Sequence, residues 1–409
     1  MSTLILLKSG DVYAPESIGV QDVLIAGNRI AAIGPNLGEG PSDWPLEVID
    51  CSGKIVMPGL VDLHTHMTGG GGEAGAATKV PAPYLSSFTT AGVTTAVGLL
   101  GTDGTTRSIS ELLAAARGLS ELGLNALCYT GSYDVPPPTL TGSVRSDIVN
   151  VDRIVALGEL AISDHRSSQP TFDQVMQLAA QAHVAGMMTG KAGLVHFHLG
   201  DGDRGLDMLR RAASEIELPR RTFHPTHVNR NPNLWKEAMA LTDLGFTIDI
   251  TAFPKAAGER GAGEYLAEYI DRGLPTEQLT MSSDGGGCLP TFNDEGVMLK
   301  MGIGSSRTLL ESIRDARELG APLDKLLATC TLNAASLFRF TRESNPPDYT
   351  LYNIKGKNVC APALCCVARG RGQRSKVDGN TAPYVTRRRS GGQQRFQKET
   401  VYILEVSLQ

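Results

Sequence analysis

Beyond about residue 55, short apolar runs alternate with amphipathic stretches. The runs are rich in Val, Ile and Leu and predict eight strands that alternate with helical segments. This pattern predicts an α/β protein whose main fold is a closed (β/α)8 TIM-type barrel of ~250 residues. An open doubly wound sheet is the alternative, although no GxGxxG motif follows an early strand. The strand candidates lie near residues 60–66, 94–100, 124–130, 154–162, 193–199, 222–227, 246–251 and 278–283.

Helix-start signals support the helical stretches. Ser108 with Glu111 forms a capping-box pattern, and Thr171 is a cap residue before another apolar stretch. A further helix is expected from Leu234 to Leu244, with Asn233 before it, and another from Arg307 to Leu319.

The first fifty residues follow a different pattern, of short strands and turns. Leu4–Leu7 predicts a strand that leads into a turn at residues 9–11, and residues 22–25 and 29–34 predict two more strands. We therefore expect a small β-domain over residues 1–54, before the barrel at residues 55–340.

The composition changes again after about residue 340. Residues 341–409 contain 12 Lys and Arg against 5 Asp and Glu, and their hydrophobic periodicity is weak. A basic nucleic-acid-binding tail is one interpretation, and a poorly ordered or altered terminus is the other. Residues 367–370 and 378–379 faintly resemble closing strands, so this divergent segment is expected to complete the β-domain in part, as a small β-sandwich.

Bulk properties narrow the classes of protein. The net charge of -5 gives no general attraction to nucleic acid or to anionic membranes. No apolar run approaches the ~20 residues that span a bilayer. The seven cysteines have no CxxC spacing and fit free thiols in a reducing compartment, so a cytoplasmic protein is expected.

Histidines and an aspartate lie at the ends of predicted strands. His64 and His66 are two residues apart, so both side chains point to one face of a strand and can reach one metal ion. His198, His227 and Asp284 close later strands, and the carboxyl ends of barrel strands meet at one rim. The sequence therefore predicts a metal site at this rim.

Two further histidines are interpreted differently. His196 lies one step deeper than His198 on the same face of its strand, and His224 is at helical rather than strand spacing from His227. We expect both to support the ligands from behind.

The chain resembles the amidohydrolase superfamily and, within it, the isoaspartyl (β-aspartyl) dipeptidases. The resemblance runs from the N-terminus to about residue 340. The HxH pattern fits any amidohydrolase, whereas the Gly-rich loop with Glu73 and the segments around Arg166 and Arg230 are specific to the dipeptidases. The matching segments are residues 8–15, 60–66, 69–75, 99–103, 130–133, 162–167, 225–231 and 282–285.

The resemblance implies a catalytic metal centre. Two zinc ions would be held by His64, His66, His198, His227 and Asp284, and they would share a bridging hydroxide of lowered pKa. Asp284 would act as general base and then as general acid. Tyr133 would donate a hydrogen bond to the tetrahedral oxyanion.

It also implies a dipeptide pocket. Glu73 would bind the free α-ammonium, and Arg166 and Arg230 would pair with carboxylates. Gly75 and Thr102 match positions that line the family's pocket. A phosphate cradle at residues 69–72 is the alternative for the Gly-rich loop, but the GxxxxGK[ST] pattern is absent.

Three features depart from the family. Many members bridge the metals with a carboxylated lysine, where this chain has Glu159, which is shorter by roughly 3–4 Å of reach. We expect Glu159 to bridge nonetheless, with a single-metal site as the alternative. Cys288 replaces a serine near the substrate carboxylate and donates hydrogen bonds weakly. The third departure is the C-terminal segment.

Cleavage of β-aspartyl dipeptides is therefore the leading hypothesis. A cyclic-amide hydrolase of the dihydroorotase or hydantoinase type is one alternative, and an inactive dipeptide-binding relative is another. The resemblance also implies a homo-oligomer, with an octamer as the candidate assembly.

Overall fold

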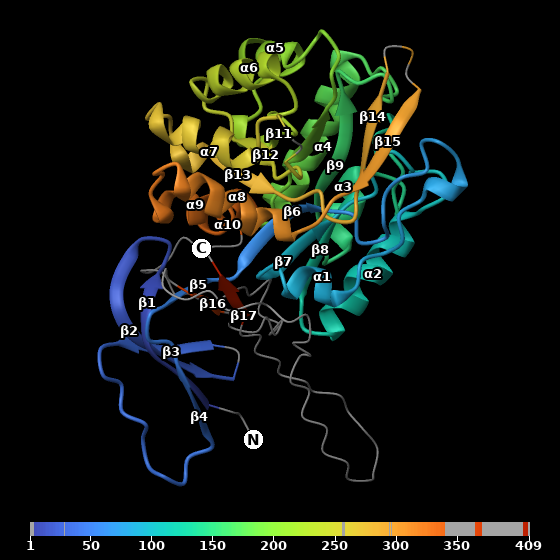
Figure 1. Ribbon diagram of the computed structural model, residues 1–409. Coiled ribbons are helices and arrows are strands. Elements are labelled where there is room, and N and C mark those ends of the chain that lie inside the picture. Colours follow the sequence, from blue (N-terminus) through green and yellow to red (C-terminus); the bar gives the residue numbers. More distant parts are fainter. Residues whose placement is uncertain are drawn as a thin grey trace, which may run out of the picture.

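The computed structural model describes residues 4–27, 29–255, 258–293, 295, 297–339, 365–369 and 404–407. Eight parallel strands of this part of the chain form a barrel, surrounded by helices (Figure 1). All their residues are buried, as expected for parallel strands covered by helices. The barrel strands are β6 (Leu60–Thr65), β7 (Val93–Gly98), β8 (Asn125–Thr130), β9 (Ile154–Ile162), β10 (Val195–Leu199), β11 (Phe223–Thr226), β12 (Ile248–Thr251) and β13 (Leu279–Ser282).

The strands close into a ring. Strands β6 to β11 are hydrogen-bonded in chain order, and β12 pairs with β13 in parallel. Strand β11 contacts β12, where the amide of Val228 lies 3.5 Å from the carbonyl oxygen of Asp249. The ends of β13 and β6 meet where the amide of His66 donates to the carbonyl of Gly285 at 2.8 Å. This closure confirms the predicted barrel.

The helices begin where cap residues predict. The Ser108 hydroxyl accepts from the amide of Glu111, and Thr171 forms a full capping box with Gln174. Helix α6 begins earlier than expected, because Asn231 is its cap and a proline, which needs no amide partner, takes the first helical position. The helices are α1 (Leu85–Thr89), α2 (Ile109–Glu121), α3 (Val144–Asn150), α4 (Phe172–Thr189), α5 (Asp207–Glu215), α6 (Pro232–Thr242), α7 (Ala262–Asp271), α8 (Arg307–Glu318), α9 (Leu323–Thr329) and α10 (Leu332–Leu337).

A second sheet lies beside the barrel, with β16 next to β5 and β17 next to β16 (Figure 1). Its buried side chains, among them Ile5, Leu7 and Val56, form a separate apolar cluster. The turn predicted at residues 9–11 is wrong: β1 continues through an irregularity at Ser9, whose amide donates to Asp22 at 2.8 Å. The strands are β1 (Leu4–Tyr13), β2 (Ser17–Ala26), β3 (Arg29–Gly34), β4 (Leu46–Asp50), β5 (Lys54–Pro58), β16 (Cys365–Arg369) and β17 (Leu404–Ser407).

The C-terminal segment contributes to this sheet. Strand β16 pairs antiparallel with β5, and β17 pairs parallel with β16. Apart from these two strands, the segment predicted at residues 341–409 lies outside the described residues, including residues 378–379.

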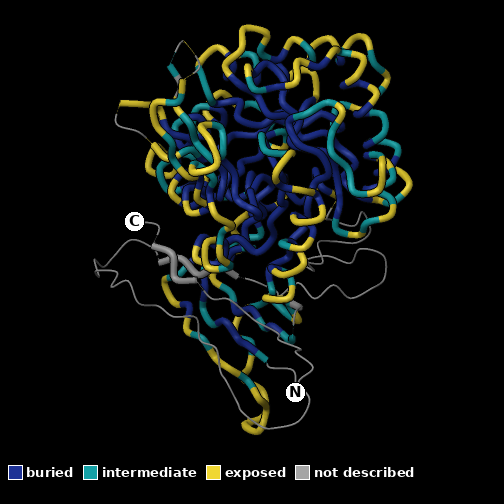
Figure 2. The backbone as a smooth tube through the Cα atoms, turned by 90° about the vertical axis from the view of Figure 1, so that its right-hand side faces the viewer, coloured by how far each residue is buried: buried dark blue, intermediate teal, exposed yellow. Residues whose placement is uncertain are grey.

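One hairpin was not predicted. Strands β14 (Cys288–Phe292) and β15 (Met298–Ile303) pair antiparallel after the last barrel strand, and β14 begins four residues after Asp284. Figure 2 shows that the buried residues are concentrated in the barrel. None of the helices in the described ranges has both the length and the low polarity needed to cross a membrane.

Candidate active site

The barrel brings all six predicted metal ligands together. Each lies on a barrel strand or directly after one, and each is at most 6% exposed. Strand β6 carries His64 with His66 just beyond its end, β9 carries Glu159, and β10 carries His198; His227 and Asp284 follow β11 and β13.

His64 and His66 both lie near one oxygen of Glu159 and one oxygen of Asp284. Nε2 of His64 lies 3.5 Å from Oε1 of Glu159 and 3.5 Å from Oδ1 of Asp284. Nε2 of His66 lies 3.0 Å from the same Asp284 oxygen and 3.8 Å from Oε1. We name this group subsite A: His64, His66, Asp284 and Oε1 of Glu159.

The other Glu159 oxygen faces the remaining histidines. Oε2 lies 3.1 Å from Nδ1 of His198 and 3.3 Å from Nε2 of His227. We name this group subsite B: His198, His227 and Oε2 of Glu159. Glu159 therefore reaches both groups of histidines, despite being shorter than a carboxylated lysine.

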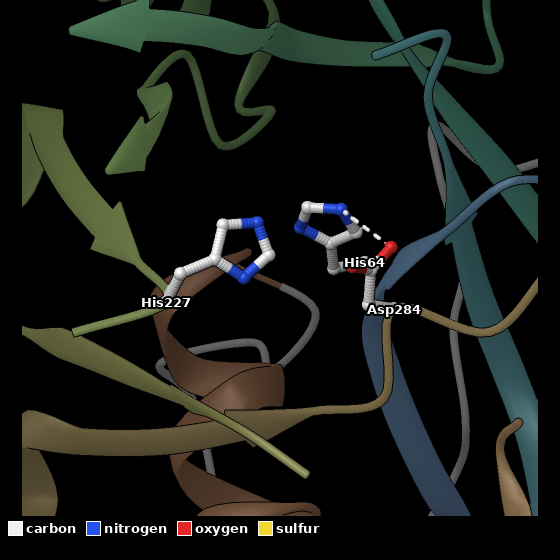
Figure 3. A group of neighbouring side chains, drawn as sticks. All are labelled: His64, His227 and Asp284. Atoms are coloured by element: carbon white, nitrogen blue, oxygen red, sulfur yellow. Dashed lines mark ion pairs between the residues drawn. The ribbon is translucent and has the colours of Figure 1, made fainter. Parts of the chain in front are cut away.

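The donor set fits a divalent cation of the zinc type. Nε2 of His64 and Oδ1 of Asp284 are buried and have no hydrogen-bond partner among the described residues. Figure 3 shows the two side chains facing each other, with His227 beside them. Two ligand atoms on one tetrahedral zinc ion are roughly 3.4 Å apart, and the separations in subsite A are 3.0–3.8 Å. All six residues belong to clusters that could hold a metal ion.

The electrostatics of the cluster favour a cation. Burial opposes charge on every group, but Glu159 and Asp284 hold the pKa of His64 well above its usual value. Burial likewise raises the pKa of Asp284, yet its ion pairs with His64 and His66 outweigh burial and hold that pKa well below the ordinary range. Carboxylates that attract protons onto a buried imidazole also attract metal ions.

Two ligands have a left-handed backbone. His227, directly after β11, has φ of 61°, and Asp284, two residues after the end of β13, has φ of 54°. This conformation costs a non-glycine residue about 1–2 kcal/mol, and such strain is typical of functional sites. It turns the chain at the point where each side chain meets its subsite.

Glu73, Thr102 and Arg166 form a polar group next to subsite B. The Thr102 hydroxyl donates to Oε1 of Glu73 at 3.1 Å, and Nη1 of Arg166 lies 3.6 Å from the same oxygen. Oε2 of Glu73 is buried and has no hydrogen bond within the described part of the chain. Burial and the nearby Glu73 raise the pKa of the Cys288 thiol to about 12, so the thiol is neutral.

Tyr133 connects this group to the ligands. Its hydroxyl lies 2.7 Å from Nδ1 of His198, and the guanidinium carbon of Arg166 lies 5.5 Å from the centre of its ring. Burial holds the pKa of Tyr133 well above its usual value, although Arg166 acts against this shift. The tyrosine hydroxyl is therefore protonated and can donate a hydrogen bond at this position.

Asp164 was missed by the sequence analysis. It accepts from Nε of Arg166 at 3.1 Å and from Nη2 at 2.7 Å, and it lies 2.9 Å from Nε2 of His198. Asp164 therefore orients a ligand and an arginine together. Its place two residues before Arg166, at the end of a predicted strand, was the available signal.

Arg230 and Gly75 make contacts with residues other than Glu73, Thr102 and Arg166. Nη1 of Arg230 lies 3.7 Å from Asp201, and its Nε is buried with no hydrogen bond to a described residue. Gly75 is exposed, has φ of 102°, and its amide donates to the carbonyl of Gly72 at 3.0 Å. This bond closes the turn that contains Glu73.

Arg107 is a second residue that the sequence analysis missed. It is buried and donates to the carbonyls of Thr68, Gly70 and Val80. It also pairs with Asp103 at 3.1 Å. These bonds hold the Gly-rich loop that leads to Glu73. The amides of Gly69 and Gly70 already donate to the carbonyls of His66 and Gly286, at 2.8 and 2.9 Å, so they are not free to bind a phosphate.

His196 and His224 lie behind the ligands, as predicted. Nε2 of His196 is 2.9 Å from Nδ1 of His64, and Nδ1 of His196 is 3.0 Å from Nδ1 of His224. Burial lowers the pKa of both rings, in His224 to about 4. Neither residue belongs to a metal-ligand cluster of the described residues.

Comparisons with known proteins agree with this geometry. The profile of the amidohydrolase family matches residues 47–103, and members of this superfamily are metal-dependent. An allantoinase from Salmonella paratyphi B is 43% identical over 68 residues, 17% of this chain, and the chain spans only 14% of that enzyme's length. A D-hydantoinase from Thermus sp., 16% identical with a TM-score of 0.53 over 82% of this chain and 81% of that one, shows the fold alone.

A solved structure gives a much stronger match. The β-aspartyl dipeptidase from Fervidobacterium islandicum AW-1, crystallised in complex with β-Asp-Leu dipeptide, is 40% identical. The superposition has a TM-score of 0.80 and covers 83% of this chain and 88% of that one. With this identity over nearly the whole fold, the chain belongs to the β-aspartyl dipeptidase family of the amidohydrolase superfamily.

Proposed function

We propose that this protein hydrolyses the β-aspartyl amide bond of isoaspartyl dipeptides. The observation that carries the proposal is the Glu73–Arg166 pair, 3.6 Å apart, beside subsite B. A β-aspartyl dipeptide has a free α-ammonium and a free α-carboxylate on one carbon atom. An acidic and a basic side chain at this separation match such a pair of charges.

The Glu73–Arg166 pair also disfavours two related kinds of compound as substrates. In an α-aspartyl dipeptide, the α-carboxyl group is part of the amide bond, so Arg166 loses its partner next to the ammonium. A cyclic amide such as dihydroorotate has no free ammonium, so it leaves Oε2 of Glu73, which is buried and has no hydrogen bond to a described residue, without a partner, which is costly. Arg230, whose Nε has no hydrogen bond to a described residue, is proposed to bind the carboxylate of the second residue. Thr102, Gly75 and Cys288 are proposed to line the same pocket.

Subsites A and B are proposed to hold two zinc ions, with Glu159 as a shared ligand. When bound, zinc lowers the pKa of water toward neutrality and polarises a carbonyl oxygen. The support is the division of the ligands: each Glu159 oxygen faces its own histidines.

Asp284 and Tyr133 are proposed to act on the substrate. The Asp284 carboxylate is ionised, so it can accept the proton of the attacking water. It then delivers that proton to the amide nitrogen as the carbon–nitrogen bond breaks. The protonated Tyr133 hydroxyl donates to the oxygen that gains negative charge in the tetrahedral transition state.

The assembly and location stay predictions. The homo-oligomer rests on the family resemblance, and the cytoplasm rests on the use of free cysteines. An inactive relative that only binds dipeptides would not need the buried Asp284 carboxylate or Tyr133 beside the ligands.

Substrate choice tests the proposal. Purified protein, stripped of metal and then supplied with zinc, is given β-Asp-Leu, α-Asp-Leu or dihydroorotate, and the release of leucine or the opening of the ring is measured. We expect zinc-dependent cleavage of β-Asp-Leu, with α-Asp-Leu at least about 10²-fold slower and dihydroorotate inert. Equal cleavage of the two Asp-Leu isomers, or opening of dihydroorotate alone, would refute the role of Glu73 and Arg166.

A further inference from the structure

A chain of hydrogen bonds runs from subsite A into the barrel. Nδ1 of His64 lies 2.9 Å from Nε2 of His196, whose Nδ1 lies 3.0 Å from Nδ1 of His224. Nε2 of His224 lies 3.0 Å from the Thr280 hydroxyl, which donates to Oδ1 of Asp249 at 2.5 Å. All five residues are fully buried.

A second chain runs from subsite B to the same carboxylate. Nδ1 of His227 lies 2.7 Å from the Thr251 hydroxyl, which is 3.4 Å from the Thr226 hydroxyl. Thr226 donates to Oδ2 of Asp249 at 2.7 Å, and Ser282 donates to the same oxygen at 2.5 Å. The two oxygens of Asp249 therefore receive two separate chains, one from each subsite.

The carboxylate sets the direction of donation along the first chain. An ionised carboxylate only accepts, so the Thr280 hydroxyl gives its proton to Asp249, which is nearer than its other acceptor, the carbonyl of Ile248 at 3.4 Å. The Thr280 oxygen then accepts from Nε2–H of His224. His224 and His196 have no carboxylate within hydrogen-bond distance among the described residues, so their buried rings are neutral, with one donor and one acceptor nitrogen each.

The remaining links follow from that starting point. Nδ1 of His224 is an acceptor, so His196 donates from Nδ1 and accepts at Nε2. His64 therefore donates from Nδ1, so Nε2, the atom that faces subsite A, is the nitrogen that can give up its proton and offer a lone pair to a metal ion. The ring of Tyr129 stacks on His196 with centroids 5.2 Å apart and holds that link in place.

The second chain gives the same result. Thr226 donates to Asp249, so its oxygen accepts from Thr251, and the Thr251 oxygen accepts from Nδ1–H of His227. The lone pair of His227 is then on Nε2, the atom that faces Oε2 of Glu159.

We propose that Asp249 is a shared positioning residue, which fixes the tautomer and ring orientation of one histidine in each subsite through two separate hydrogen-bond chains. This inference rests on the proposed metal function of the subsites. Groups that orient metal ligands from behind typically change metal affinity by about 10–100-fold when they are removed.

A matched pair of variants tests the proposal. Thr280 and Thr226 are both fully buried barrel-strand threonines that donate to Asp249, each in one chain. T280V breaks the His64 chain alone, and T226V breaks the His227 chain alone. T280S and T226S keep the hydroxyl and serve as the rescue controls, and D249N changes the acceptor of both chains.

Zinc dissociation constants are measured by chelator competition, and the thermal unfolding of the metal-free proteins is followed in parallel. To assign each effect to a subsite, the valine variants are also made in a background of H66A, which removes a ligand of subsite A. We expect each valine variant to weaken the binding of one zinc ion by about 10–100-fold. D249N should weaken the binding of both ions, and the serine variants should bind zinc as tightly as the wild type. In the H66A background, T226V should still weaken the binding of the remaining zinc ion, in subsite B, and T280V should not.

Other results overturn the proposal in distinguishable ways. If both valine variants lower the melting temperature but leave both zinc affinities unchanged, the chains are structural only. If T280V and T226V act alike in the H66A background, the two chains are not separate. A wild-type chain that binds no zinc refutes the proposed metal function itself, and this inference with it.

Discussion

Nε2 of His64 and Oδ1 of Asp284 lie 3.5 Å apart, both buried and both without a hydrogen bond to a described residue (Figure 3). Two buried polar atoms left in this way cost about 1–3 kcal/mol each. A shared cation removes that cost for both atoms.

Gly101 should be needed for tight metal binding, because a larger residue would collide with two of the ligands. A Cβ atom at this position would lie 2.6 Å from Cε1 of His66 and 3.1 Å from Oε1 of Glu159. G101A should therefore displace two ligands of subsite A and weaken zinc binding by at least about 10-fold. Zinc binding to the metal-free protein, measured by chelator competition, checks this expectation.

Gly53 provides the control for that experiment. Its φ of 70° is close to the 75° of Gly101, but a Cβ atom there would meet nothing within 4 Å. G53A should cost about the same 1–2 kcal/mol of backbone strain while leaving zinc binding intact. Equal loss of zinc in both variants would show that strain, and not the crowding of the ligands, is the cause.

Tyr133 should contribute to the chemical step. Y133F removes a protonated hydroxyl that lies 2.7 Å from Nδ1 of His198, and we expect kcat for β-Asp-Leu to fall by about 10²–10³-fold. Zinc content and the melting temperature should change little, because the ring and its contacts are kept. Wild-type kcat in Y133F would remove Tyr133 from the mechanism.

Glu73 should recognise the substrate ammonium. E73Q should lower kcat/KM for β-Asp-Leu by about 10–100-fold, because the variant loses a charge-assisted hydrogen bond to the substrate ammonium. N-acetyl-β-Asp-Leu lacks the ammonium, so wild type and E73Q should cleave it at similar, low rates. E318Q, a change at an exposed glutamate at the end of α8, is the control. A loss of the same size with both substrates would mean that Glu73 acts on something other than the ammonium.

The Cys288 thiol should be unreactive at neutral pH. Its pKa is raised to about 12, first by burial and then by Glu73, whereas a free cysteine titrates near 8.5. Since a raised pKa favours the protonated form, folding keeps Cys288 neutral below pH 12, and the stability it contributes is lost as the pH rises from about 8.5 toward 12.

Alkylation of Cys288 by iodoacetamide, followed by peptide mass spectrometry, measures this directly. We expect a rate at pH 8.5 well below that of the unfolded chain, and a faster rate in E73Q because one cause of the shift is removed. Alkylation of folded wild type as fast as that of the unfolded chain would contradict the assigned environment.

Most of the ligands could be predicted from the sequence, because a barrel brings the carboxyl ends of its strands together at one rim. Ligand-type residues at those strand ends are therefore expected to meet. His64 and His66 share a strand face at spacing i, i+2, and His198, His227 and Asp284 each close or follow a recognisable apolar run. Glu159 could be assigned only through the family resemblance, since a lone glutamate in a buried run has many explanations.

Other parts could not be predicted in the same way. Arg107 and Asp249 act through partners that are distant in the chain, such as Thr68 and Thr226, and local periodicity carries no information about such contacts. Asp249 did leave a signal, since a charged residue between two isoleucines in a barrel strand must be paired when it is buried. The irregularity of β1 at Ser9 was interpreted as a turn because a bulge and a turn use the same residue types.

A zinc titration tests the central claim, that Glu159 joins two metal subsites into one catalytic centre. Metal-free protein receives zinc in small steps, and β-Asp-Leu hydrolysis is measured at each step. The shared Glu159 predicts activity that rises until two equivalents of zinc per chain are bound and then levels off. Full activity at one equivalent would contradict the bridging role of Glu159, and no hydrolysis at any zinc level would contradict the proposed function.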